Sequence, residues 1–178
     1  MKAVVIRGKG TPVANNVEVV DDWNNLTPGF KEVVVKTEAS ALNHLDLWVG
    51  IGMPGLGLEY PRVSGSDGCG IVSAIGEGVD ESWLGKRVLL NAAVQQPEPI
   101  LPNTEPAGED IRMIGEHDHG TNAEYFSAPI QNILDVGNAN PENAAAFGLA
   151  HLTAWRMLVT RAKLQAGQTV LITGIGGG

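Results

Sequence analysis

One short polar stretch, residues 43–46 with the sequence Asn-His-Leu-Asp, holds the residue types most able to take part in chemistry. His44 is a candidate proton donor because the unperturbed pKa of histidine lies near neutrality. Asn43 fits the N-cap of a short helix equally well, and for Asp46 a first-turn acid that stabilises this helix is the simpler interpretation. From the residues alone, both the catalytic and the structural interpretation stay open.

A second polar pair, Ser66 and Asp67, is followed closely by the only cysteine of the chain, Cys69. The pair fits either the lining of a site or a polar turn between two strands. Cys69 stands among glycines and apolar residues, where a small buried side chain is the simpler expectation than a reactive thiol.

Two histidines flank an aspartate in His117-Asp118-His119, a set of side chains able to bind a metal. The segment is polar and reads as exposed, which is more typical of a solvated turn. We therefore expect no metal site here.

The end of the sequence holds a possible phosphate-binding turn. The apolar run 169–173 (TVLIT) predicts a strand buried on both faces. It leads into Gly174, Gly176, Gly177 and Gly178, and glycines after such a strand allow a tight turn and close approach of the backbone to a pyrophosphate. The G-x-G-x-x-G spacing is unfinished, and alone such a run is also typical of a linker.

Short strands must position most of these residues. Runs rich in Val, Ile, Leu or aromatic residues, broken by Gly, Pro, Asn and Asp, predict a β-rich, barrel-like first part. The expected strands are 2–7, 32–38, 68–75, 87–91, 123–128 and 133–134. A helix of one or two turns is expected at 43–50. Residues 92–114, rich in proline and acids, predict a loop or lobe with no central strand or long helix.

A long helix is expected from Asn140 to about Lys163. Asn140 is a suitable N-cap, Pro141 suits the first helical position, and Glu142 suits the first turn. Apolar residues extend around most of the circumference of this helix, so it requires neighbours on several sides.

Composition excludes several classes of function. With 178 residues, 43% of them hydrophobic and 18% charged, the chain has the composition of a globular protein. No apolar run approaches the roughly 20 residues that span a bilayer, and the N-terminus lacks the apolar core of a signal peptide. A net charge of −8 disfavours nucleic acid as a partner. A single cysteine fits a reducing compartment, so we expect a cytoplasmic protein.

Several widely spaced segments, in this order, resemble the medium-chain dehydrogenase/reductase superfamily, in particular its zinc-type alcohol dehydrogenase-like and quinone oxidoreductase-like branches. The segments that carry the resemblance are MKAVVIRGKG, EVVVKTEASALNHLDLWVG, YPRVSGSDGCGIVSAIGEGV, LGKRVLLN, GTNAEYFSAP, AAAFGLAHLTAWRML and AGQTVLITGIGGG.

The resemblance implies a fold that is mainly β with some α. A GroES-like β-barrel catalytic domain is expected over 1–138, followed over 139–178 by a linking helix and the first strand and glycine turn of a truncated NAD(P)-binding Rossmann domain. Under this interpretation the chain is a fragment of a longer enzyme, and the full-length protein is one that can form a homo-oligomer.

The resemblance also implies that the usual zinc ligands are replaced. Zinc-dependent relatives place a cysteine where this sequence has Asn43, a Gly-His-Glu where it has Gly65-Ser66-Asp67, and a cysteine where it has Leu149. A catalytic zinc needs about three ligands of Cys, His, Asp or Glu type, so we expect no metal.

The expected function is zinc-independent hydride transfer from NADP(H), in preference to NAD(H), to a quinone, an enone or another activated carbonyl. The resemblance assigns Asn43, His44, Asp46, Ser66 and Asp67 to the catalytic site. It assigns Thr153, Gly174, Gly176, Gly177 and Gly178 to the cofactor. The partner is then a small-molecule carbonyl substrate, with no nucleic acid and no membrane.

Two alternatives remain open on the sequence. One is a non-catalytic GroES-like module for packing or partner contact, and the other is a zinc-dependent alcohol dehydrogenase with unusual ligands.

Overall fold

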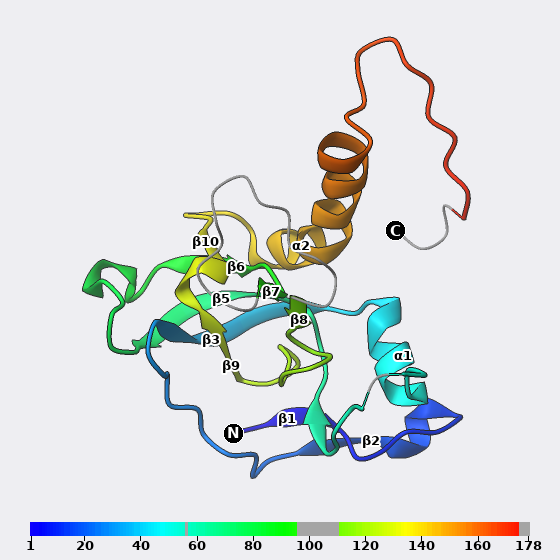
Figure 1. Ribbon diagram of the computed structural model, residues 1–178. Coiled ribbons are helices and arrows are strands. Elements are labelled where there is room, and N and C mark those ends of the chain that lie inside the picture. The colour runs from blue at the N-terminus through cyan, green and yellow to red at the C-terminus, as the bar shows by residue number, and fades with distance from the viewer. Residues whose placement is uncertain (56, 96–110, 175–178) are drawn as a thin grey trace.

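A curled five-stranded antiparallel sheet forms the centre of the molecule (Figure 1). The computed structural model describes residues 1–55, 57–95 and 111–174. The strand order of the central sheet is β10-β6-β5-β3-β9. These strands are β3 (Glu32–Ala41), β5 (Asp67–Ile75), β6 (Arg87–Leu90), β9 (Tyr125–Pro129) and β10 (Ile133–Asp135).

Two smaller antiparallel sheets flank the central one, one with the order β2-β1-β4 and one that pairs β7 with β8. Their strands are β1 (Ala3–Ile6), β2 (Val17–Val20), β4 (Arg62–Val63), β7 (Ala93–Gln95) and β8 (Ile111–Met113). Single 3-10 turns occur at Val13–Asn16, Glu81–Trp83 and Ile130–Asn132.

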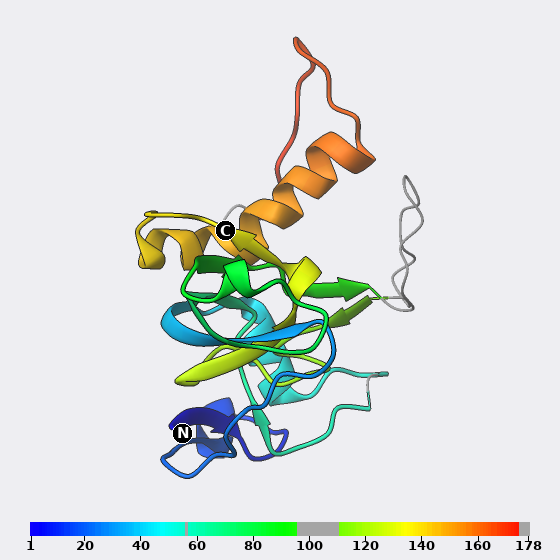
Figure 2. The ribbon, with the colours of Figure 1, turned by 90° about the vertical axis from the view of Figure 1, so that its left-hand side faces the viewer.

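Two helices complete the described chain, α1 (His44–Ile51) and α2 (Pro141–Trp155), and α2 continues as a π-helical turn, Arg156–Arg161. The first part of α2 packs on the central sheet through its small residues Ala144 and Ala145, which lie against Cys69. Its later turns rise away from the sheet (Figure 2). In the described residues no helix is both long and apolar enough to cross a membrane.

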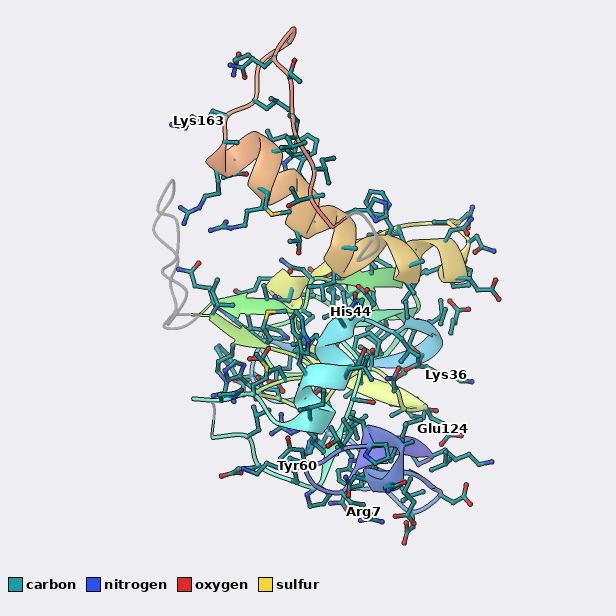
Figure 3. All side chains as sticks on the ribbon, turned by 90° about the vertical axis from the view of Figure 1, so that its right-hand side faces the viewer. Arg7, Lys36, His44, Tyr60, Glu124 and Lys163 are labelled. Atoms are coloured by element: carbon teal, nitrogen blue, oxygen red, sulfur yellow. The ribbon has the colours of Figure 1, made fainter. Side chains whose placement is uncertain are left out.

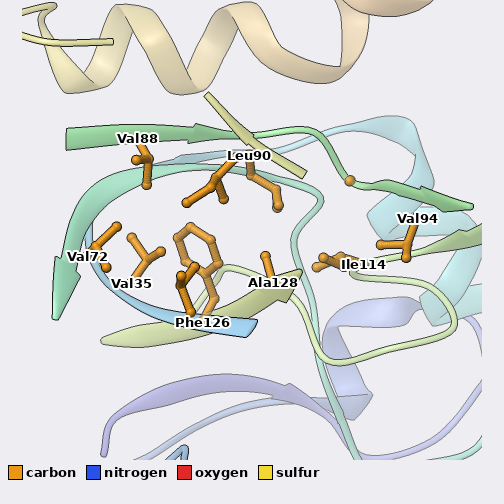
Figure 4. Close-up of a cluster of buried hydrophobic side chains, with 11 residues drawn as sticks. Val35, Val72, Val88, Leu90, Val94, Ile114, Phe126 and Ala128 are labelled. Atoms are coloured by element: carbon orange, nitrogen blue, oxygen red, sulfur yellow. The ribbon is translucent and has the colours of Figure 1, made fainter. Parts of the chain in front are cut away.

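The main core lies inside the curl of the central sheet (Figure 4). Residues alternate between the two faces of a strand, so the β-branched residues of β3 and its neighbours present one apolar face inward. Phe126 of β9 fills the middle of this core and is 1% exposed. It packs among Val33, Val35, Val72, Val88, Leu90, Ala92, Val94, Ile114, Ala128 and Ile133.

The expectation of a mainly β chain with some α is confirmed. All six expected strands form, with bounds shifted by up to three residues, and α1 forms where the short helix was expected. At the start of α2, the side chain of Asn140 accepts a hydrogen bond from the N–H of Asn143 at 2.9 Å, and Pro141 occupies the first turn. Four short strands, β2, β4, β7 and β8, had no clear signal in the sequence.

The described part of 92–114 agrees with a lobe that holds no central strand and no long helix, since β7 and β8 pair with each other outside the central sheet; 96–110 lie outside the described residues. Two other expectations were wrong in part. The helix expected to continue to Lys163 gives way to the π-helical turn after Trp155. The run 169–173 forms no strand, and Leu171 is 87% exposed. A strand needs a neighbour to accept its hydrogen bonds, and no described strand lies beside this run.

Candidate functional site

Strand pairing brings the two polar stretches together. Strands β3 and β5 are antiparallel, and Ala41 at the end of β3 pairs with Asp67 at the start of β5. Asn43 follows two residues after Ala41 and is the N-cap of α1. The site is therefore built where β3 turns into α1, beside the start of β5.

Asp46 closes the turn into α1. One carboxylate oxygen, Oδ2, accepts a hydrogen bond from the backbone N–H of Asn43 at 2.8 Å, and Oδ1 accepts one from the backbone N–H of Gly65 at 2.8 Å. Burial raises the pKa of Asp46, and these two hydrogen bonds act in the opposite direction. With both oxygens bound to the backbone, Asp46 braces the loop around Gly65 against the start of α1.

Asp67 links three segments through its side chain and is only 2% exposed. Its Oδ2 accepts a hydrogen bond from Nδ2 of Asn43 at 2.9 Å, and its Oδ1 accepts one from the backbone N–H of Leu149 in α2 at 2.6 Å. Burial raises the pKa of Asp67, and the two hydrogen bonds oppose the rise. The charge of nearby Asp46 raises the pKa further, and His151 lowers it.

A glycine in α2 makes room for the Asp67 carboxylate. A Cβ atom added to Gly148 would lie 2.3 Å from Oδ1 of Asp67, closer than any real contact between these atoms. Glycine is unfavourable inside a helix by up to about 1 kcal/mol relative to alanine. Gly148 is thus explained by the close approach of a side chain from another element.

A cavity of about 860 Å³ opens beside the start of α1. Polar side chains from Asn43, His44 and Asp46 contribute to its wall. The remainder is largely apolar and includes Ile6, Val13, Val17, Val19, Leu42 and Leu47. Figure 3 shows His44 at the first turn of α1, on the side that faces α2. A largely apolar cavity of this size with a few polar groups is typical of a small-molecule site.

Within the described residues, the side chain of Ser66 makes no hydrogen bond to Asp67 or to the residues around it. Its side chain is 1% exposed and its Oγ has no hydrogen-bond partner there. A Cβ atom added to Gly115 would lie 2.5 Å from this Oγ, so Ser66 points toward the turn that contains Gly115. Ser66 stands in the bend just before β5, whereas Asp67 is the first residue of that strand.

The residues expected to hold a cofactor lie on the part of the chain beyond the sheet. Thr153 is an exposed residue of α2, one turn after Leu149. Gly174 has a φ of +73°, a conformation that favours glycine, and open space surrounds it. Gly176, Gly177 and Gly178 lie outside the described residues.

The His117-Asp118-His119 stretch serves the fold. Nδ1 of His119 accepts a hydrogen bond from the N–H of Val63 at 3.3 Å, and its ring meets that of Trp23 edge to face. Burial lowers the pKa of His119. Asp118 pairs with Arg112 at 2.6 Å. Within 1–55, 57–95 and 111–174, no cluster of three or more His, Cys, Asp or Glu side chains is arranged to hold a metal ion.

The sequence did not reveal the contributions of Gly65, Gly148 and Leu149 to this network. Gly65 and Leu149 act through their backbone N–H groups, which every residue other than proline carries, so residue type gives no signal. Gly148 did leave a signal, because a glycine inside a helical pattern indicates a close packing contact.

Comparison with known proteins identifies the family to which this chain is similar. Residues 29–138 match the family model of the alcohol dehydrogenase GroES-like domain. A zinc-type alcohol dehydrogenase-like protein, YogA, of Leptosphaeria maculans is 35% identical over 159 residues, which cover 85% of this chain and 44% of the relative. A quinone oxidoreductase of Rattus norvegicus is 26% identical over 151 residues, which cover 85% of this chain and 39% of the relative.

Solved structures agree with this match. A crystal structure of an NAD-dependent alcohol dehydrogenase has a TM-score of 0.80 and 40% identity, and the match covers 94% of this chain and 49% of that one. A mycobacterial structure complexed with NADPH has a TM-score of 0.69 and 26% identity, with 94% and 42% covered. The chain thus spans less than half the length of these curated relatives.

Proposed function

The chain belongs to the alcohol dehydrogenase family that shares the GroES-like domain, and from this premise we propose that it is the front part of a zinc-independent, NADPH-dependent reductase of quinones, enones or other activated carbonyl compounds. The observation that carries the proposal is the pair of hydrogen bonds on Asp67, from Asn43 and from Leu149.

The side chains at this site do not fit a catalytic zinc. Asp67 is the one carboxylate among the three positions where the resemblance places ligands, and both its oxygens already accept hydrogen bonds. Asn43 offers an amide that donates to this carboxylate, and Leu149 offers no ligand atom in its side chain. A catalytic zinc needs about three ligands of Cys, His, Asp or Glu type, and this donor set supplies too few.

The choice of substrate follows from that donor set. A metal that polarises an oxygen stabilises the alkoxide formed in simple alcohol oxidation. A quinone or enone needs less help, because its conjugated system spreads the negative charge that it receives. The nicotinamide cofactor, when bound, supplies the hydride. The substrate class is therefore one in which hydrogen bonds from the protein are sufficient.

Asn43 and His44 are assigned the direct roles. One N–H of the Asn43 amide is engaged by Asp67, and its second N–H is available to a substrate oxygen in the adjoining cavity. His44 is exposed on the wall of the same cavity and supplies the proton that accompanies the hydride in a two-electron reduction. Asp46 and Asp67 hold these residues in place.

The cofactor is assigned to the other side of the site. Thr153 would approach the nicotinamide ring, and the turn beginning at Gly174 would approach the pyrophosphate. The open space around Gly174 suits such an approach. A structural relative complexed with NADPH supports the choice of NADPH, while another relative is NAD-dependent, so the two cofactors are to be compared directly. We place the enzyme in the cytoplasm, as a protein able to form a homo-oligomer.

A substrate and cofactor panel tests this function on the complete gene product. We expect NADPH to support reduction of 1,4-benzoquinone and of methyl vinyl ketone with a kcat/KM at least ten times that with NADH. Oxidation of a primary alcohol with NADP⁺ should be at least 100 times slower than either reduction. Fast alcohol oxidation would contradict the substrate class, and absence of nucleotide binding would favour a non-catalytic module.

A further inference from the structure

We propose that Asp67 is a positioning residue that ties the start of α1 to the middle of α2 and thereby sets where α2 leaves the sheet. This proposal rests on the proposed function in one respect: that function gives a role to the two positioned parts, Asn43 and the α2 segment with Thr153. The tie itself is a property of the fold and is measurable without turnover.

The bonding of Asp67 supports a tie between elements. It stands at the start of β5, and its two carboxylate oxygens accept from two different helical elements, the N-cap residue Asn43 and Leu149 of α2. Thr121 fixes the base of the same residue, since its Oγ1 donates to the backbone oxygen of Asp67 at 2.7 Å. A charge-assisted hydrogen bond is about twice as strong as a neutral one, and both bonds here involve a buried carboxylate.

The path of α2 is consistent with a side chain reaching into it. The N–H of Leu149, which in a regular α-helix points at the carbonyl oxygen of residue 145, donates to Oδ1 of Asp67 at 2.6 Å, so a side chain from another element reaches the backbone of α2. Figures 2 and 3 both show α2 changing direction between its first turns on the sheet and its later turns. Insertion of a side chain into the ladder of helix hydrogen bonds is a known cause of such bends.

Gly148 gives an independent sign of the same contact. Its missing Cβ leaves the space that Oδ1 of Asp67 occupies, since an added Cβ would lie 2.3 Å from that oxygen. Two ionisable side chains near the contact also act on the Asp67 carboxyl group electrostatically: Asp46 raises the pKa of Asp67, and His151 on α2 lowers it. The carboxylate is thus enclosed by β5, α1 and α2 together.

Nuclear magnetic resonance detects the tie directly in this chain. An amide proton that donates to a carboxylate shifts when the carboxylate loses its charge, so we expect the Leu149 amide resonance to move with the protonation of Asp67. Because burial raises the pKa of Asp67, the midpoint should lie above the ordinary value of 3.8. The movement should vanish in Asp67→Asn. The Gly65 amide, which donates to Asp46, is the matched control and should keep its own titration in that variant.

Exchanging the donor and the acceptor of the hydrogen bond between residues 43 and 67 tests whether this bond, and not simply the presence of an aspartate at 67, is what stabilises the fold. Asn43→Asp places two carboxylates side by side and should lower the midpoint of denaturant unfolding. Asp67→Asn can still accept from Leu149, and in the double variant Asn43→Asp/Asp67→Asn the new amide at 67 donates to the new carboxylate at 43. We expect the double variant to recover at least half of the midpoint lost in Asn43→Asp.

Gly148→Ala supplies a test that does not depend on the Asn43→Asp/Asp67→Asn double variant. Alanine should lower the unfolding midpoint when Asp67 is present and raise it when Asp67 is replaced by alanine, because alanine favours a helix once the carboxylate is gone. A Leu149 amide that is unmoved through the titration of Asp67 would overturn the proposal. So would additive losses in the double variant, or a Gly148→Ala effect of the same sign in both backgrounds. If these three results hold but the unsubstituted full-length protein shows no reductase activity, the proposed function alone is wrong.

Discussion

Replacing Asn43 and His44 together by alanine is expected to lower kcat/KM of the full-length enzyme for a quinone by about 10²–10⁴-fold, the range typical of a lost proton donor. Asn43 lines the cavity and donates one amide N–H to Asp67, and His44 lies exposed on the same wall. In the proposed mechanism both groups act on charge that develops as the substrate is reduced, so the loss should fall mainly on kcat.

Steady-state kinetics with NADPH and 1,4-benzoquinone measure this effect, and two further variants separate its parts. His44→Ala alone removes an exposed side chain that makes no hydrogen bond to another described residue, so its unfolding midpoint should stay unchanged while kcat falls. Asn138→Ala, at an exposed position before α2, is the matched control and should behave as the wild type. Unchanged turnover in the Asn43/His44 double variant would remove both residues from the mechanism.

Phe126→Ala is expected to have the largest effect on stability, lowering the free energy of unfolding by about 3–5 kcal/mol. The ring is 1% exposed and fills the centre of the core inside the curled sheet (Figure 4). Valines and other small apolar side chains surround it, and a closely packed core relaxes only in part around such a void.

Denaturant unfolding followed by circular dichroism measures this loss. Phe30→Ala removes the same side chain from a position that is 67% exposed, and it should cost less than about 1 kcal/mol. Similar losses in the two variants would show that the core is not centred on Phe126.

The expected strands and caps followed from local patterns. Short runs rich in Val and Ile, bounded by Gly, Pro, Asn or Asp, predicted β3 and β5. Asn140 before Pro141 predicted the start of α2, because the cap and the proline act within one helical turn. Such signals depend on residues close together in the sequence, so they can be recognised without knowing which distant segments pack against them.

Contacts between distant residues were not predictable in the same way. The hydrogen bond from Leu149 to Asp67 joins residues 82 positions apart and uses a backbone donor. The pairing of β7 with β8 connects two short runs on either side of a proline-rich stretch. The run 169–173 failed as a strand because apolar sequence alone does not supply the neighbouring strand that it needs.

The roles of Asn43, Asp46 and Asp67 illustrate the limit at the site itself. Sequence left each residue between a catalytic and a structural role. In the structure Asp46 accepts a hydrogen bond from the N–H of Gly65, and Asn43 donates to Asp67 while also lining the cavity. Residue type could not decide this, because the same carboxylate can brace a loop or react, according to which donors surround it.

The proposed site works without zinc, and the metal content of the full-length enzyme shows whether it does. The enzyme is purified without chelators, its zinc is measured by mass spectrometry, and turnover of 1,4-benzoquinone with NADPH is followed before and after treatment with a strong chelator. We predict less than about 0.1 zinc per chain, a level too low for a site with about three protein ligands, and unchanged turnover after chelation. One zinc per chain, with turnover lost on chelation and restored by added zinc, would contradict the account.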